Sequence, residues 1–228
     1  MADLPVALSR PNLSARLHSI VDIDGKLLRA LEELGPLRGR DVVIVDDGSR
    51  ARAAQIEALG ARARSVPIGE LGTLEEGTAD VVVAPWAAFV AGDPAFDEEV
   101  AAAGRVARPE GRLLVVQDYG RDDVRDLIGL PPGMGPRPRD RDDFFLDRGF
   151  KIRVLHCWWT FDSLEDARSF LAEAFGEAGV ATGASLRRPR LAHNIGIYHR
   201  DLGASDRPAA APAGARASSP STVAKRAS

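Results

Sequence analysis

The amino-acid sequence predicts an α/β protein with a Rossmann-like, mostly parallel sheet. Short runs of apolar, β-branched residues at 41–46, 79–84 and 111–118 have the length and composition of buried central strands. Stretches with helical periodicity lie between these runs, and no internal repeat is present. Strands that alternate with helices in this way are typical of a parallel sheet covered by helices on its faces.

Three further strands complete the predicted sheet. Residues 61–68 have the pattern of a weaker strand, 151–161 that of a long strand and 191–198 that of the last strand. On the long strand, Trp159 shares a face with Cys157, and Trp158 points to the opposite face. Core packing and ligand stacking are both open for these aromatic residues.

Helices are expected between the strands. Asp24 is suited to cap a helix that ends at Leu34, because Gly35 and Pro36 follow and stop it. Further helices are expected at 49–59, 94–107, 122–128 and from Ser163 onward. The stretch 130–140 is rich in Pro and Gly, so we expect a flexible loop there.

Composition excludes several classes of protein. The chain has 228 residues, 45% of them hydrophobic, which suits one domain. A single cysteine and the lack of any apolar run near the roughly 20 residues that span a bilayer exclude a disulfide scaffold and a membrane protein. The N-terminus lacks the pattern of an export signal, so the cytoplasm is the expected compartment. The formal charge of -3 does not favour nucleic acid as the main partner.

The chain is expected to divide into a domain, 1–203, and a tail, 204–228. The tail consists mainly of Ala, Pro, Ser and Gly, cannot bury much surface and is expected to be disordered. Abundant Ala and the excess of Arg over Lys fit a GC-rich bacterial genome. The four histidines are scattered, and His156 and Cys157 point to opposite faces of one strand, so no metal site is expected.

Two segments carry a resemblance to a known family. The strand and loop at 79–89, and the Arg-x-x-Arg-Pro-x-Gly pattern at 105–111 before the next strand, are similar to class I SAM-dependent methyltransferases. The resemblance extends in order over roughly residues 20–202. It implies a Rossmann-like sheet with a closing antiparallel strand, SAM as the cofactor and a small molecule as the methyl acceptor.

The resemblance implies a cofactor loop at the end of the first strand. Asp46 and Gly48 match the acidic residue and the first loop glycine, and Ser49 follows. Arg50 and Arg52 stand where the family has glycines. Their bulk is expected to crowd the cofactor, and their charge to oppose its sulfonium.

The chain is also short in this region. Only 34 residues separate Asp46 from Asp80, whereas the family's elements there need about 60 by ordinary element lengths. One strand-helix unit is therefore expected to be missing. No acid ends the 61–68 strand to hold the ribose hydroxyls, and Glu70 is the nearest candidate.

Two functions remain open at this point. The first is a non-catalytic or weakly active homologue that binds a small molecule or a related protein subunit, possessing a degraded SAM site. The second is an active SAM-dependent methyltransferase on a small molecule, with Trp86 lining the cleft and Asp118 or Tyr119 near the substrate. A cap for the helix expected at 122–128 is an equally simple role for Asp118. Oligomeric state is left open.

Other motifs are weaker. The Asp-x-Asp-Gly run at 22–25 resembles the opening of haloacid dehalogenase phosphatases, and 17–21 has the composition of the strand this would need. The acids at 46–47 resemble those of receiver domains, but 84–86 offers no phosphate acceptor. No phosphate-binding glycine motif is present.

Overall fold

The sheet and its flanking helices come from a computed structural model. It describes residues 8, 10–21, 23–46, 51–125, 127–128 and 138–203. The candidate residues Gly48 and Ser49, together with Arg50, lie outside the described residues. The same holds for 130–137 of the expected loop and for the expected tail 204–228. The last residues of the expected loop, 138–140, are helical.

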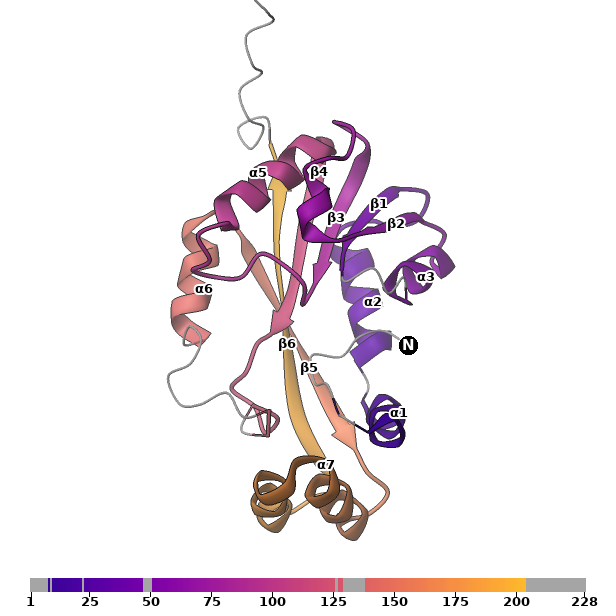
Figure 1. The fold of residues 1–228 in the computed structure, drawn as a ribbon, viewed down its shortest axis with the longest axis vertical. Helices are drawn as coiled ribbons and strands as arrows, with labels where there is room; N and C mark the ends of the chain where they lie inside the picture. The colour runs from indigo at the N-terminus through magenta and orange to yellow at the C-terminus, as the bar shows by residue number, and fades with distance from the viewer. Residues whose placement is uncertain are drawn as a thin grey trace, which may run out of the picture.

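Six strands form one sheet in the order β2-β1-β3-β4-β6-β5 (Figure 1). Their bounds are β1 Asp41–Val45, β2 Arg62–Val66, β3 Ala79–Pro85, β4 Ala107–Asp118, β5 Lys151–Thr160 and β6 Arg190–Leu202. The first four strands are parallel, and β6 runs antiparallel to both of its neighbours. The predicted Rossmann-like sheet with a closing antiparallel strand is confirmed. One strand, β2, lies between β1 and β3 in the described chain, as the short spacing indicated.

Helices cover both faces of the sheet (Figure 1). They are α1 Pro11–Ile20, α2 Ile23–Leu34, α3 Ala51–Ala58, α4 Ile68–Leu71, α5 Phe96–Val106, α6 Pro138–Asp147 and α7 Leu164–Ser185. The β-branched residues of β1 alternate between two cores, because successive side chains of a strand point to opposite faces. Val43 and Val45 pack with Phe96 of α5, whereas Val42 and Ile44 pack with residues of α2 and α3.

The β5–β6 pair extends beyond the carboxyl end of β4. Pairing of β4 with β6 stops at Asp118 opposite Ile195, but β5 and β6 remain paired as far as Thr160 opposite Arg190. Figure 1 shows this ribbon running from the sheet to α1 and α7. A third apolar core, which includes Leu17, Trp159 and Phe170, joins the ribbon to these helices.

Helix α7 consists of two antiparallel segments. Gly176 has φ 57° and ψ -132°, a conformation open chiefly to glycine, and the helical path breaks there (Figure 1). The segments approach closely, since a Cβ on Gly179 would lie 1.8 Å from the Leu171 carbonyl oxygen. Ser163 caps the first segment through a 3.0 Å hydrogen bond that its Oγ accepts from the Asp166 amide.

Three expectations from the sequence were wrong. Residues 121–125 form bends and a turn instead of the start of a helix, because Asp122 and Asp123 bind amides of β6. Helix α2 begins at Ile23, so Asp24 lies within the helix instead of preceding it as a cap. Residues 17–20 end helix α1, with Leu13 and Leu17 packed in the third core, and so do not form the strand that the phosphatase resemblance would need. The helices α1, α4 and α6 were not anticipated.

Candidate functional site

The candidate site lies at the carboxyl ends of β1, β3 and β4, where open α/β sheets place their binding crevice. Trp86 follows β3 directly and has φ 56°, a left-handed conformation that is strained for a bulky residue. Its amide donates to the Val116 carbonyl at 2.9 Å, which holds the turn against β4. The β5–β6 ribbon extends past this edge of the sheet.

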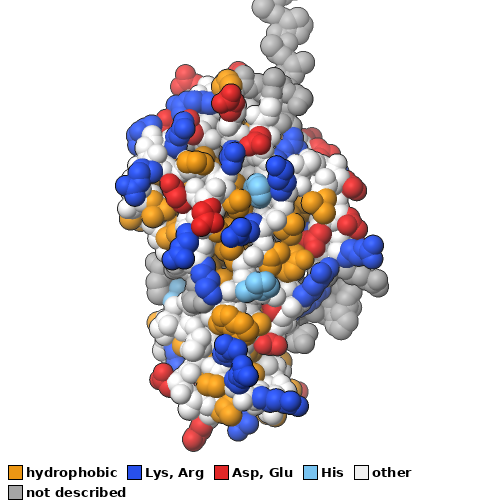
Figure 2. Space-filling model, turned by 180° about the vertical axis from the view of Figure 1, so that it is seen from behind, with side chains coloured by type: hydrophobic (Ala, Val, Ile, Leu, Met, Phe, Trp, Pro, Cys, Tyr) orange, Lys and Arg blue, Asp and Glu red, His pale blue; other side chains and the backbone are white. Residues whose placement is uncertain are grey.

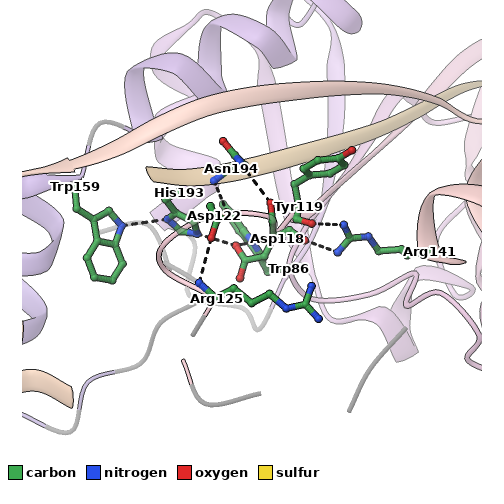
Figure 3. Close-up of polar contacts among 10 residues, drawn as sticks. Trp86, Asp118, Tyr119, Asp122, Arg125, Arg141, Trp159, His193 and Asn194 are labelled. Atoms are coloured by element: carbon green, nitrogen blue, oxygen red, sulfur yellow. Dashed lines mark hydrogen bonds and ion pairs between the residues drawn. The ribbon is translucent and has the colours of Figure 1, made fainter. Parts of the chain in front are cut away.

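Asp118 is the centre of a polar chain that links three strands (Figure 3). One of its oxygens, Oδ1, accepts from His193 Nε2 at 3.1 Å and lies 3.4 Å from Trp86 Nε1. Trp159 Nε1 donates to His193 Nδ1 at 3.1 Å. The predicted candidates Trp86 and Asp118 are therefore brought together, and His193 joins them from β6.

The direction of these hydrogen bonds assigns the tautomer of His193. Because an indole N–H only donates, His193 Nδ1 accepts and the ring proton sits on Nε2. The imidazole is then neutral, and it is 2% exposed. Asp118 receives hydrogen bonds from neutral donors, so they orient its carboxylate without cancelling its charge.

Asn194 clamps the turn after β4 onto β6. Its amide donates to Asp122 Oδ2 at 2.7 Å, and its side-chain Nδ2 lies 3.3 Å from the Arg121 carbonyl oxygen. Asp122 Oδ1 accepts from the Arg125 amide at 3.1 Å, and burial raises the pKa of this carboxyl group. Asp122 therefore caps a turn, whereas the carboxylate of Asp118 is used in the polar chain.

Arg141 of α6 holds the end of β4 on the side where the Tyr119 ring lies. Its guanidinium donates to the carbonyl oxygens of Asp118 and Tyr119, and its Nε donates to the Tyr198 hydroxyl at 2.7 Å. Burial raises the pKa of that hydroxyl, which donates to Asp142 at 2.6 Å. Figure 3 shows the Tyr119 ring pointing away from the Asp118 carboxylate. The structure thus places the side chains of the candidate residues Asp118 and Tyr119 on opposite sides of the chain at the end of β4.

Asp46 and Arg52 follow the carboxyl end of β1. Asp46 follows β1 and is 6% exposed, and its Oδ2 accepts from the Ser65 hydroxyl at 2.5 Å. Arg52 of α3 is 3% exposed. Its Nη1 donates to Gln55 at 2.8 Å, and its guanidinium carbon lies 5.8 Å from the centroid of the Trp86 ring.

The end of β2 offers no buried carboxylate among the described residues. The strand ends at Val66, and Glu70 is exposed on α4. Elsewhere, Cys157 is fully buried, and the exposed His156 bonds through Nδ1 to Asn194 Oδ1 at 2.9 Å. The described part of the chain contains no group of three or more residues that would suit a metal ion.

Sequence reasoning missed His193 and Arg141. His193 stands on a correctly predicted strand, but its pairing with Asp118 depends on how far β6 runs past β4. Arg141 belongs to a helix whose periodicity is weak, since most of its residues are charged. Of the two roles left open for the aromatic residues of β5, Trp159 has core packing and not ligand stacking, because it is 1% exposed and packs with α1 and α7.

Figure 2 shows acidic and basic side chains interspersed on the face seen from behind. No helix within the described residues has the length and apolar character needed to cross a membrane.

Comparison with known proteins gives structural matches alone. No protein-family model and no curated protein sequence matches this chain. A protein assigned as a type II methyltransferase from Anaeromyxobacter dehalogenans is 18% identical, with a TM-score of 0.49 and coverage of 78% of this chain and 96% of that one. One assigned as a methyltransferase from Bacillus halodurans is 16% identical, with a TM-score of 0.45 and coverage of 78% and 100%.

A third match is phosphoethanolamine N-methyltransferase 2 from Haemonchus contortus, solved with S-adenosylhomocysteine. It is 14% identical, with a TM-score of 0.43 and coverage of 78% of this chain and 52% of that one. Because these three TM-scores are all below 0.5, the fold is assigned from the strand order and strand directions described above.

Proposed function

We propose that this chain is a methyltransferase-like protein that does not use SAM and instead binds another small molecule in its crevice. The observation that carries the proposal is the place of Arg52. A buried cation lies against Trp86, at the edge of the sheet where the family holds its cofactor. Its bulk and its positive charge both oppose a ligand that carries a sulfonium.

The groups expected to hold the cofactor also fit SAM poorly. Ribose hydroxyls need a carboxylate beyond β2, and the nearest acid among the described residues, Glu70, is exposed on α4. Asp46 is retained, but its carboxylate is buried and accepts from Ser65. Since a fold does not determine an activity, the likeness to methyltransferases does not outweigh these residues.

Other features support a retained binding role. Trp86 and Asp118 still meet at the carboxyl ends of the central strands, and a buried chain of hydrogen bonds orients them. Such a network is costly to bury unless its members are satisfied and held in place. A small molecule is therefore the ligand we favour, and a related protein subunit is the other partner consistent with a non-catalytic homologue.

Titration calorimetry of the full chain tests the proposal. We expect no heat of binding with SAM or S-adenosylhomocysteine up to millimolar concentrations. Binding of SAM in the micromolar range would overturn it. Replacing both Arg50 and Arg52 with Gly is expected to restore measurable affinity if the side chains block the cofactor. The matched control is Arg64→Gly on the edge strand β2, where the side chain is exposed.

The second candidate function is an active SAM-dependent methyltransferase on a small molecule. The retained Asp46 at the end of β1 favours it. In that case Asp46, Gly48 and Ser49 contact the cofactor, Trp86 lines the cleft, and Asp118 or Tyr119 lies near the acceptor. The related protein subunit named as the other partner of a non-catalytic homologue has a separate test. Mixing the chain with a related, intact methyltransferase is expected to raise the activity of that methyltransferase.

A further inference from the structure

We propose that Asp118 is the anchoring carboxylate for a ligand that carries a primary amine. This inference deepens the proposed function and rests on it, since it assigns a ligand class to the same crevice. It starts from the unequal use of the two carboxylate oxygens. Oδ1 is the oxygen that faces His193 and Trp86, while Oδ2 makes no hydrogen bond within the described residues.

The charge of Asp118 is not neutralised within the described part of the chain. His193 is the one side chain there within ion-pair distance of its carboxylate, and that imidazole is neutral by its hydrogen bonds. Arg141 lies nearby but donates to the backbone carbonyl of Asp118. The Asp118 side chain is 27% exposed, so a ligand can reach it.

The molecule also fixes the direction of this carboxylate. Trp159 holds His193, and His193 holds Oδ1 from a position that is almost fully buried. His193 is thus a positioning residue, whose two ring nitrogens are both occupied. An oriented, partly desolvated carboxylate with one open oxygen is suited to a charge-assisted hydrogen bond from an ammonium group.

Trp86 limits how the amine is recognised. Arg52 already lies over its ring, so a second cation at that surface would be repelled. The indole nitrogen points instead toward Asp118. Recognition of the amine therefore comes from the carboxylate, and Trp86 offers an apolar edge to the rest of the ligand.

The test compares two probes, benzylamine and benzyl alcohol, which differ in the charged group. Binding to the full chain is followed by the NMR shift of the Trp86 indole N–H, assigned with Trp86→Phe. We expect a saturable shift with benzylamine and an affinity at least about tenfold weaker for benzyl alcohol, the value of one modest charge-assisted contact. Equal binding of the two probes, or no saturable shift with either, would overturn the proposal.

Two variants assign the preference to one residue. Asp118→Asn removes the charge and keeps the shape, and it is expected to abolish the preference for the amine. Asp123→Asn is the matched control, because Asp123 lies in the same turn but binds the Ala192 amide; it should keep the preference. An unchanged preference in Asp118→Asn would refute the assignment.

The wild-type comparison needs no variant, so it holds even if Asp118→Asn fails to fold. The SAM titration separates this inference from the proposed function. SAM binding would overturn the function whatever benzylamine does. Loss of the amine preference with no SAM binding would overturn this inference alone.

Discussion

His193 and Asp118 are 75 positions apart in the chain, yet His193 Nε2 donates to Asp118 Oδ1 at 3.1 Å. The contact exists because β6 continues past the last residue that pairs with β4. This overhang carries His193 to the carboxyl end of the sheet, where Trp86 also arrives from β3. The extension of β6 thus brings residues that are far apart in the chain into one site.

The hydrogen bond between Trp159 and His193 should contribute to stability. His193→Ala leaves the buried Trp159 N–H without its acceptor and opens a cavity. We expect a loss of about 2–4 kcal/mol in the free energy of unfolding, measured by urea denaturation. His156→Ala, at an exposed position on β5, is expected to cost less than about 1 kcal/mol. Equal losses would contradict the role of the buried chain.

The close approach within α7 predicts a sensitive glycine. Gly179→Ala places a methyl group 1.8 Å from the Leu171 carbonyl oxygen, so the two segments must separate. We expect a loss of about 3 kcal/mol, seen as a lower urea midpoint.

Gly25→Ala in α2 is the control for this substitution. Nothing lies within 4 Å of its added Cβ, so the higher helix propensity of Ala should stabilise the protein by about 0.5–1 kcal/mol. If both variants behaved alike, the antiparallel arrangement of the α7 segments would be wrong.

A cluster at the amino ends of β1 and β3 predicts a pH dependence. Hydrogen bonds from Arg62 and then Arg108 lower the pKa of Asp41 to about 2. Because the folded value lies below the ordinary 3.8, the stabilisation is complete above that pH and is lost as pH falls toward 2. Solvent screening limits it to about 0.5–1 kcal/mol, because the Asp41 side chain is 30% exposed.

Asp41→Asn measures this contribution. The difference in unfolding free energy between wild type and variant should be largest above about pH 4 and shrink toward pH 2. Asp97→Asn removes a more exposed partner of Arg148 and should show a smaller difference throughout. A wild-type advantage that grows as pH falls would have the wrong sign.

The cap of α7 predicts a modest effect. Ser163→Ala removes the acceptor of the Asp166 amide and is expected to cost about 1 kcal/mol in unfolding free energy. Ser185→Ala at the other end loses a hydrogen bond from the hydroxyl to the Thr182 carbonyl and should cost less. Thermal unfolding of the two variants side by side checks the order.

The sequence alone determined the sheet. Short apolar, β-branched runs bounded by turn residues favour buried strands, so β1, β3 and β4 were predictable, as were Trp86 and Asp118 at strand ends. The spacing of Asp46 and Asp80 also indicated the missing unit. The strands and their ends depend on neighbours within a few positions, and the missing unit depends on the length of chain between two strands, so both can be inferred from the sequence.

Tertiary structure decided the rest. The break at Gly176 folds α7 back on itself, although the residues on both sides have helical patterns. Arg52 was expected to crowd the cofactor, but its burial against Trp86 depends on where α3 packs. The partner of Asp118 depends on the register of β6, which no local pattern fixes. Contacts between residues far apart in the chain are set by packing, and packing here made the site.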